Sequence, residues 1–320
     1  MQAVDQEVLT QVCHWLKEGQ SCWLATVVAT YGSSPRPVGS LFTCSKKARV
    51  VGSLSGGCVE EDLVEKLVTG ELASDKPFFM RYGKTEAEAT KFGLPCGGQL
   101  DIVVEPLNAL DSIHVIYSQI NSVLNQRGSV RRTVELDTGD SKIVETSKYS
   151  PLVYDAENHL LVQTYGPRRQ LFIIGTNMVA QYVAEFAQTL DFRVTVVDTD
   201  QTKIDSFPVP GVEKVCDLPD DIVLKQANDQ NSAIVALSHD PRLDDMALIG
   251  AFETRAFYIG AMGSQKTSSA RRDRLRALGV SERELTRLHA PIGFDIGSKT
   301  PPEIAVSIMA EITQTQYNKN

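Results

Sequence analysis

A glycine turn between an apolar strand and a helix is the first feature of this sequence that could bind a ligand. Residues 171–174 are apolar and lead into Gly175, and Asp198 follows 23 residues later at the end of a second apolar run. In dinucleotide-binding folds the glycine permits a tight turn, the helix N-terminus binds the pyrophosphate and the acid binds the ribose hydroxyls. The spacing therefore predicts a nucleotide pocket formed by Gly175, Asn177 and Asp198.

The glycine pattern of this turn is incomplete, because Asn177 stands where the second glycine would be. Asparagine tolerates the left-handed backbone region, but its side chain fills the place where backbone normally approaches the pyrophosphate. Two alternatives remain open: the ligand binds in a different way, or the turn only starts a doubly wound sheet. If a nucleotide binds, Asp198 favours an NAD-like ligand over NADP, since an acid disfavours a 2′-phosphate.

Two more loops follow predicted strands of the same half of the chain. Residues 238–240 read Ser-His-Asp, and residues 260–264 read Gly-Ala-Met-Gly-Ser. Open α/β sheets bind ligands at the carboxyl ends of their strands, so these loops contribute His239, Gly260, Gly263 and Ser264 to the candidate site. His239 is either a proton donor or phosphate partner, or an ordinary polar loop residue. The basic residues that come next either meet anionic ligand groups or form a solvated helix face; they are Lys266, Arg271, Arg272 and Arg274.

Three loops in the first half combine glycine with cysteine or proline. Cys58 follows paired glycines at a predicted helix start, where unpaired N–H groups stabilise a thiolate or an anion, although Glu60 and its acidic neighbours oppose this. Cys96 precedes another glycine pair, whose backbone can approach a bulky ligand closely. Together the loops predict one binding site, and the alternative is three turns with buried thiols. The candidate residues are Gly32, Ser33, Ser34, Arg36, Ser55, Gly56, Gly57, Cys58, Cys96, Gly97 and Gly98.

The elements that must position these loops follow from the apolar patterning. In the first half we expect three helices: one over residues 4–18, one that starts at Cys58, and one that follows the strand at 99–105 and ends near residue 125. We expect strands over 22–30, 40–44, 49–54 and 99–105, and β-hairpins from about 129 to 165. The second half alternates strand and helix, with strands at 170–174, 193–197, 214–217, 233–238 and 256–260, which predicts a doubly wound parallel sheet. The fold class is α/β, with a mixed α/β domain over 1–165 and a Rossmann-like domain over 166–320.

Length and composition restrict the class of protein. A chain of 320 residues exceeds the usual size of one hydrophobic core, so two domains are expected. The net charge of −8 disfavours a nucleic-acid partner. The six cysteines show neither a CxxC pair nor Cys/His ligand spacing, so we expect no metal site. We also expect no membrane partner and a cytoplasmic protein, because we find no signal segment and no apolar stretch of about 20 residues.

Six segments resemble the XdhC/CoxI family and the Rossmann domain that accompanies it. Those similar to the XdhC/CoxI domain are GSSPRPVGSLF (32–42), GSLSGGCVEEDL (52–63) and GLPCGGQLDIVVEPL (93–107). Those similar to the Rossmann domain are HDPRLDD (239–245), FYIGAMGS (257–264) and GFDIGSKTPPEIAVSI (293–308). Two departures from the family pattern affect the nucleotide site. Asn177 interrupts the usual Gly-x-Gly-x-x-Ala, and Asp198-Thr199-Asp200 replaces the usual acid pair followed by a basic residue.

The resemblance implies an accessory protein that matures molybdenum hydroxylases of the xanthine or aldehyde dehydrogenase type. Such a protein binds the molybdenum cofactor, as molybdopterin or its dinucleotide form, protects it during sulfuration and inserts it into the enzyme. It is a maturation factor rather than a catalyst, and the implied associations are the hydroxylase, a cysteine desulfurase and a second copy of the chain. Arg36 and backbone amides would meet the phosphate, and a cysteine would lie near the exchangeable sulfur.

An NAD-dependent oxidoreductase is the alternative that the residues leave open. The predicted nucleotide fold permits hydride transfer, and either His239 or Tyr258 would serve as the proton relay. Against this alternative, we find no His, Lys or Tyr paired convincingly with a substrate-orienting arginine.

Overall fold

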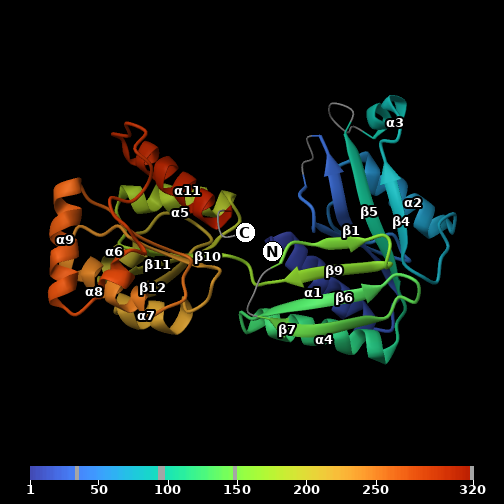
Figure 1. Cartoon of the computed structure of the whole chain (residues 1–320), viewed down its shortest axis with the longest axis horizontal. Helices are drawn as coiled ribbons and strands as arrows, with labels where there is room; N and C mark the ends of the chain where they lie inside the picture. Colours follow the sequence, from blue (N-terminus) through green and yellow to red (C-terminus); the bar gives the residue numbers. More distant parts are fainter. Residues whose placement is uncertain (33–35, 93–97, 147–149, 318–320) are drawn as a thin grey trace. The chain divides into compact units, whose positions relative to one another are not determined.

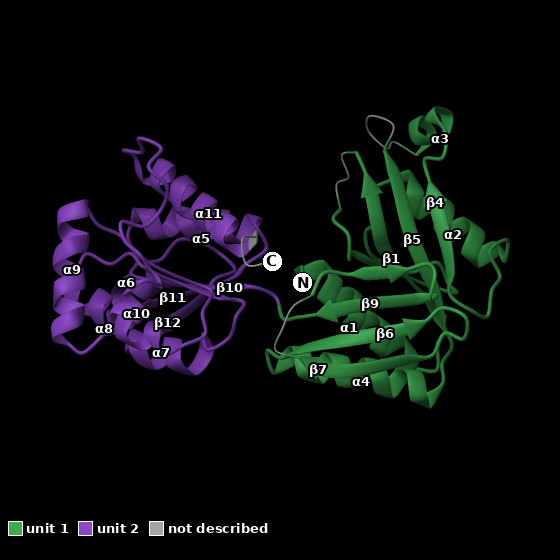
Figure 2. Cartoon of the chain, viewed as in Figure 1, with its two compact units in different colours: residues 1–167 green, residues 168–320 purple. Residues whose placement is uncertain are grey.

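The computed structural model describes residues 1–32, 36–92, 98–146 and 150–317. The chain divides into two compact units, Met1–Pro167 and Arg168–Asn320 (Figures 1 and 2). In the part that the structure describes, no helix combines the length and the apolar character needed to cross a bilayer.

The first unit contains a five-stranded antiparallel sheet with the strand order β3-β2-β1-β5-β4 (Figure 1). Its strands are β1 (Cys22–Tyr31), β2 (Leu41–Ser45), β3 (Val50–Gly52), β4 (Phe78–Tyr82) and β5 (Gln99–Leu107). Helix α2 (Cys58–Thr69) packs Val59, Leu63 and Leu67 onto one face of this sheet. Strand β4 and the short helix α3 (Glu86–Lys91) were not predicted from the sequence, because their short amphipathic runs are bounded by few clear turn signals.

A second antiparallel sheet, β7-β6-β9-β8, completes the first unit together with two helices. Its strands are β6 (Ser129–Glu135), β7 (Ser141–Thr146), β8 (Val153–Asp155) and β9 (Leu160–Tyr165), and the helices are α1 (Ala3–Lys17) and α4 (Asp111–Asn125). The two helices pack against each other in one core cluster around Trp15 and Tyr117. A buried ion pair ties the sheets together, since Arg132 of β6 donates to both carboxylate oxygens of Glu105 at 2.9 and 2.7 Å.

The second unit is the expected doubly wound fold, with a parallel sheet in the order β12-β11-β10-β13-β14-β15. Helices α5 (Met178–Thr189) and α11 (Pro301–Tyr317) share a core on one face of the sheet. Helices α7 (Pro219–Gln226), α8 (Pro241–Phe252) and α9 (Gln265–Ala277) share a core on the other face. The strands are β10 (Gln170–Ile174), β11 (Arg193–Asp198), β12 (Glu213–Cys216), β13 (Ser232–Ala236), β14 (Tyr258–Ala261) and the unpredicted β15 (Leu288–His289). The unit also contains the short helices α6 (Gln201–Asp205) and α10 (Glu282–Leu285).

Candidate functional site

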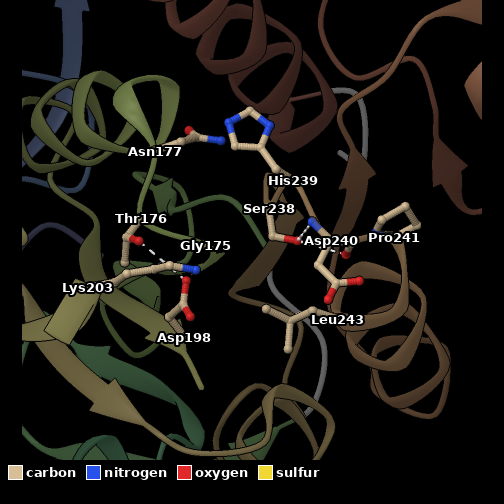
Figure 3. Close-up of a pocket in the computed structure, with 10 residues that line it drawn as sticks. All are labelled: Gly175, Thr176, Asn177, Asp198, Lys203, Ser238, His239, Asp240, Pro241 and Leu243. Atoms are coloured by element: carbon tan, nitrogen blue, oxygen red, sulfur yellow. Dashed lines mark hydrogen bonds between the residues drawn. The ribbon is translucent and has the colours of Figure 1, made fainter. Parts of the chain in front are cut away.

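A pocket of about 540 Å³ lies at the carboxyl edge of the parallel sheet (Figure 3). It opens beside β10, where the chain passes to β11 on one side and the sheet continues to β13 on the other. This reversal of strand order is the place where open α/β sheets bind ligands. The pocket is lined by Gly175, Thr176, Asn177, Asp198, Lys203, Ser238, His239, Asp240, Pro241 and Leu243.

Both the backbone conformation and the close neighbours at position 175 require a glycine. Its φ of +99° lies in the region that L side chains rarely adopt. A Cβ atom at this position would lie 2.8 Å from the Ser238 Cα and 2.9 Å from the Ser238 nitrogen. The two loops that form the pocket therefore touch through their backbones at Gly175, as the first glycine of a dinucleotide turn demands.

Asn177 is the N-cap of α5 and is not in the left-handed region. Its φ of −70° and ψ of 177° are extended, and its Oδ1 accepts a hydrogen bond from the Ala180 nitrogen at 2.9 Å. Its Nδ2 donates to the carbonyl of Leu237, the residue that follows β13. The tolerance of asparagine for left-handed backbone is thus irrelevant here. The Asn177 side chain caps the helix, so the Ala180 amide, which could otherwise bind a phosphate, already donates to Asn177.

Asp198 is buried at the end of β11 and is held by two donors. The Thr176 hydroxyl lies 3.3 Å from its Oδ2, and the Asp200 nitrogen lies 3.1 Å from its Oδ1. The exposed Lys203, three residues after Asp200, lines the same pocket. The sequence reasoning missed both Thr176 and Lys203. The sequence did contain a signal for Lys203. Helix α6, to which Lys203 belongs, follows Asp198 directly and so begins at the carboxyl edge of the sheet, where the pocket lies.

The loop after β13 presents an exposed histidine on a fixed backbone. The backbone N–H of Ser238 donates a hydrogen bond to Asp244 Oδ1 at 3.0 Å, and the Ser238 hydroxyl accepts one from the Asp240 nitrogen at 3.1 Å. Asp240 in turn caps α8 by accepting from the Arg242 nitrogen at 2.9 Å. His239, between these anchored residues, lies on the Asn177 side of the pocket (Figure 3).

Three candidate residues of the second unit lie apart from this pocket. Gly260 is inside β14, where a Cβ would lie 2.5 Å from Ile292 Cδ1, so its role is close packing. Ser264 is the N-cap of α9 and accepts from the Thr267 nitrogen at 3.1 Å, while Gly263 packs against Thr267. Tyr258, the alternative proton relay, is buried and donates its hydroxyl to Glu311 at 2.6 Å.

The arginines of α9 hold the helix in place instead of meeting a ligand. The Arg271 side chain is only 3% exposed and pairs with Asp244 at 2.8 Å. Arg274 pairs with Asp245 at 2.6 Å, and Arg272 donates to two backbone carbonyls. Both alternatives drawn from the sequence, a ligand-binding row and a solvated face, are therefore wrong for Arg271. Its acidic partners lie on α8, far away in the sequence.

In the first unit, the loop before α2 is already occupied by the carboxylate of Glu60. Its two oxygens accept from four successive backbone nitrogens, at 2.8 to 3.1 Å, and from two serine hydroxyls, at 2.9 and 2.8 Å. Glu60 was expected to oppose an anion at the helix start. Its carboxylate instead occupies the amides of the loop that precedes the helix, so these amides are not available to a ligand while Glu60 holds them. The donors are Ser53, Leu54, Ser55, Gly56 and Gly57.

Cys58 is the first residue of α2, and the residue is exposed to solvent. Arg36 is engaged with its own unit: it pairs with Asp5 at 3.0 Å and donates to the Ser53 carbonyl at 3.3 Å and to the Gln2 side chain. An anion bound at Arg36 would therefore have to share the guanidinium with Asp5. Gly32 and Gly98 adjoin β1 and β5, whereas Ser33, Ser34, Cys96 and Gly97 lie outside the described residues.

Comparison with known proteins supplies matches to nearly the whole chain. Residues 171–312 match a family model described as the XdhC Rossmann domain, and residues 15–83 match the XdhC and CoxI family model. A protein of Bacillus subtilis described as a probable xanthine dehydrogenase subunit is 24% identical, over 94% of this chain and 95% of its own length. The molybdenum cofactor insertion chaperone PaoD of Escherichia coli is also 24% identical, over 95% of this chain and 86% of its own length.

The fold as a whole also occurs in a solved structure. A crystal structure described as a xanthine dehydrogenase from Bacillus halodurans superposes with a TM-score of 0.72. The match covers 99% of this chain and 96% of that one, at 22% identity. At this identity the likeness establishes the shared architecture.

Proposed function

The chain belongs to the XdhC and CoxI family, and from that premise we propose that it is an accessory protein in the maturation of a molybdoenzyme. The observation that carries the proposal is a likeness over nearly the whole chain to a molybdenum cofactor insertion chaperone. The chain binds the molybdenum cofactor as cargo, keeps it while its terminal sulfur ligand is installed, and inserts it into a hydroxylase of the xanthine or aldehyde dehydrogenase type. A cysteine desulfurase and a second copy of the chain are its further partners.

In this proposal the two units have different tasks. The loops of the first unit hold the pterin and metal end of the cargo, with Cys58 and Cys96 close to the exchangeable sulfur. The exposed position of Cys58 at the start of α2 supports this role, since a buried thiol would be inaccessible to the cargo. The pocket of the second unit binds a nucleotide, supported by Gly175 at the tight turn and by the buried acid Asp198.

Anaerobic titration of the purified protein with molybdenum cofactor tests the main proposal. We expect molybdenum and pterin to co-elute with the protein, and we expect the double variant Cys58→Ala, Cys96→Ala to lose most of this retention and of the activation of a partner hydroxylase. Cys216→Ala is the matched control, because Cys216 is an exposed cysteine of the second unit. Unchanged activation by the double variant would remove the role of the two cysteines, and no retention by the native protein would remove the function.

Asp198→Asn tests the nucleotide pocket. The substitution removes a negative charge that would accept hydrogen bonds from ribose hydroxyls, so we expect the affinity for NAD to fall about tenfold. The affinity for NADP should not fall, since the carboxylate disfavours the 2′-phosphate. Isothermal titration of both nucleotides measures the effect, with Asp205→Asn on the exposed side of α6 as control. Tighter binding of NADP than of NAD by the native protein would contradict the assignment.

The competing interpretation, an NAD-dependent oxidoreductase, retains only one of its two relay candidates. His239 lines the pocket, whereas Tyr258 is buried against Glu311. Binding of NAD without any retention of molybdenum cofactor would favour this interpretation.

A further inference from the structure

Aromatic rings and one guanidinium form a continuous row on the first unit, which we call the aromatic row: Tyr31, Arg81, Phe79 and Tyr154. The Arg81 Cζ lies 5.7 Å from the ring centroid of Tyr31 and 5.8 Å from that of Phe79. The rings of Phe79 and Tyr154 stack with centroids 5.4 Å apart and planes at 12°. Tyr31 is 50% exposed and Phe79 is 40% exposed, so the row offers flat, partly apolar surface to a ligand.

The guanidinium of this row is held in a fixed orientation. Its Nε and one terminal nitrogen donate to the two carboxylate oxygens of Asp101, at 2.6 and 2.7 Å. Asp101 is buried on β5 and faces Arg81 in the register of β4 and β5. A guanidinium has five N–H donors, and this pair uses two of them. Arg81 thus presents a rigid plane with further donors, in a position fixed before any ligand arrives.

The row begins where two of the glycine loops leave the sheet. Tyr31 is the last residue of β1 and pairs with Gln99, the first residue of β5. Gly32 follows Tyr31 directly, and Gly98 precedes Gln99 directly. Strands β1, β5 and β4 lie side by side in Figure 1, so Arg81 is two strands away from Tyr31 on the same sheet. A ligand bound at Gly32 and Gly98 would therefore lie beside Tyr31 and near Arg81.

We propose that the Tyr31 end of the aromatic row is a stacking site for the planar pyrimidinone ring of a pterin. The inference rests on the proposed function and adds a subsite to it. Stacking on an exposed tyrosine and an arginine plane suits a flat heteroaromatic ring. The N–H groups of Arg81 lie in the plane of the guanidinium, so the arginine contributes its face and its charge to the stacked ring rather than hydrogen bonds. The Asp101 carboxylate keeps the guanidinium from turning away from the ring.

Fluorescence titration with unsubstituted pterin tests the stacking site. We expect Tyr31→Leu and Arg81→Lys each to weaken pterin binding about tenfold, which is typical of the loss of one stacking partner. Tyr31→Phe keeps the ring and should bind within about twofold of the native protein. Arg193→Lys makes the same exchange in an exposed ion pair of the second unit, with Glu213, and should change nothing. NAD binding should be the same in all variants.

The result that overturns the inference is distinguishable from failure of the proposed function. Equal binding of pterin and equal retention of molybdenum cofactor by Tyr31→Leu and the native protein overturn the stacking site, while the cofactor function stands. No pterin binding by the native protein overturns it as well. Normal pterin binding by Tyr31→Leu with failed hydroxylase activation would make the row a protein-docking surface, which also overturns it. Tyr31→Leu keeps the test valid if Arg81→Lys does not fold, because Tyr31 is exposed.

Discussion

Replacement of Glu60 by alanine should destabilise the first unit by about 2–4 kcal/mol, because it leaves the donors of a whole loop without their acceptor. Glu60 accepts from the backbone nitrogens of residues 54–57 and from two serine hydroxyls, all at 2.8 to 3.1 Å. Charge-assisted hydrogen bonds of this kind are stronger than those between neutral groups. Chemical denaturation monitored by tryptophan fluorescence measures the loss, since Trp15 and Trp23 both lie in this unit.

Added anions distinguish a vacated anion site from general damage to the loop. In Glu60→Ala the freed amides should bind phosphate or formate, so millimolar anion should restore part of the stability of the variant but leave the native protein unchanged. Glu60→Gln is the control for shape, because it keeps one acceptor oxygen but places donors against the amides. Equal stability of Glu60→Ala and the native protein would show that the loop does not depend on the carboxylate.

The stability supplied by Glu60 should depend on pH in a defined direction. Burial alone would raise the pKa of Glu60, but hydrogen bonds from Ser55, Gly56 and Leu54 outweigh it and lower the pKa to about 2. A carboxyl with a pKa below its ordinary 4.5 stabilises the fold above pH 4.5 and loses this contribution as the pH falls towards 2. The stability difference between the native protein and Glu60→Ala should therefore shrink between pH 4.5 and 2.

The occupied loop also changes how the cargo can be bound. The amides of Ser55, Gly56 and Gly57 can meet a cargo phosphate only if the Glu60 carboxylate leaves them. Cys58 is the exposed group at this loop that needs no such displacement. In the proposed contact with the cargo, the thiol of Cys58 therefore meets the cargo without displacing Glu60, whereas a phosphate at the amides of residues 55–57 would have to displace it.

The second unit was more predictable from sequence than the first, for a physical reason. Strands of a parallel sheet are buried on both faces and appear as short apolar runs, so the strand endings at Gly175 and Asp198 could be located in the chain. The carboxyl ends of such strands share one edge, and the pocket indeed brings together Gly175, Asn177, Asp198 and His239. The positions of Gly260 and Ser264 could not be inferred from this rule, because Gly260 belongs to β14 itself, where it packs against Ile292, and Ser264 caps α9.

Charged side chains that pair with other groups of the protein were the main source of error in predicting the candidate site from the sequence. Glu60 was seen as an acid that opposes an anion, yet it stands three residues after the N-cap Gly57, where a glutamate commonly reaches back to the loop. That spacing was a usable signal. Arg271 and Arg274 gave no local signal, since their partners Asp244 and Asp245 lie 26 or more residues earlier on a different helix. Long-range pairing of this kind follows from the tertiary fold alone.

Gly175→Ala should destabilise the second unit by roughly 2–4 kcal/mol and abolish nucleotide binding. The alanine would adopt a φ near +99°, and its Cβ would lie within 3.0 Å of three atoms of Ser238. Two of these are backbone atoms, so no side-chain rotation can relieve the contact. The loop after β13 must move instead, and it carries His239. Calorimetric unfolding and NAD titration measure the two effects.

Gly279→Ala separates the backbone strain from the contact with Ser238. Gly279 has a similar φ of +95°, but a Cβ there meets nothing within 4 Å. Its substitution should therefore cost only about 1 kcal/mol and leave NAD binding unchanged. The difference between the stability lost in Gly175→Ala and that lost in Gly279→Ala measures the energetic cost of disturbing the contact between the loops after β10 and β13. If both variants lost the same stability and both bound NAD, that contact would not shape the pocket, and the tight turn would reflect strand geometry alone.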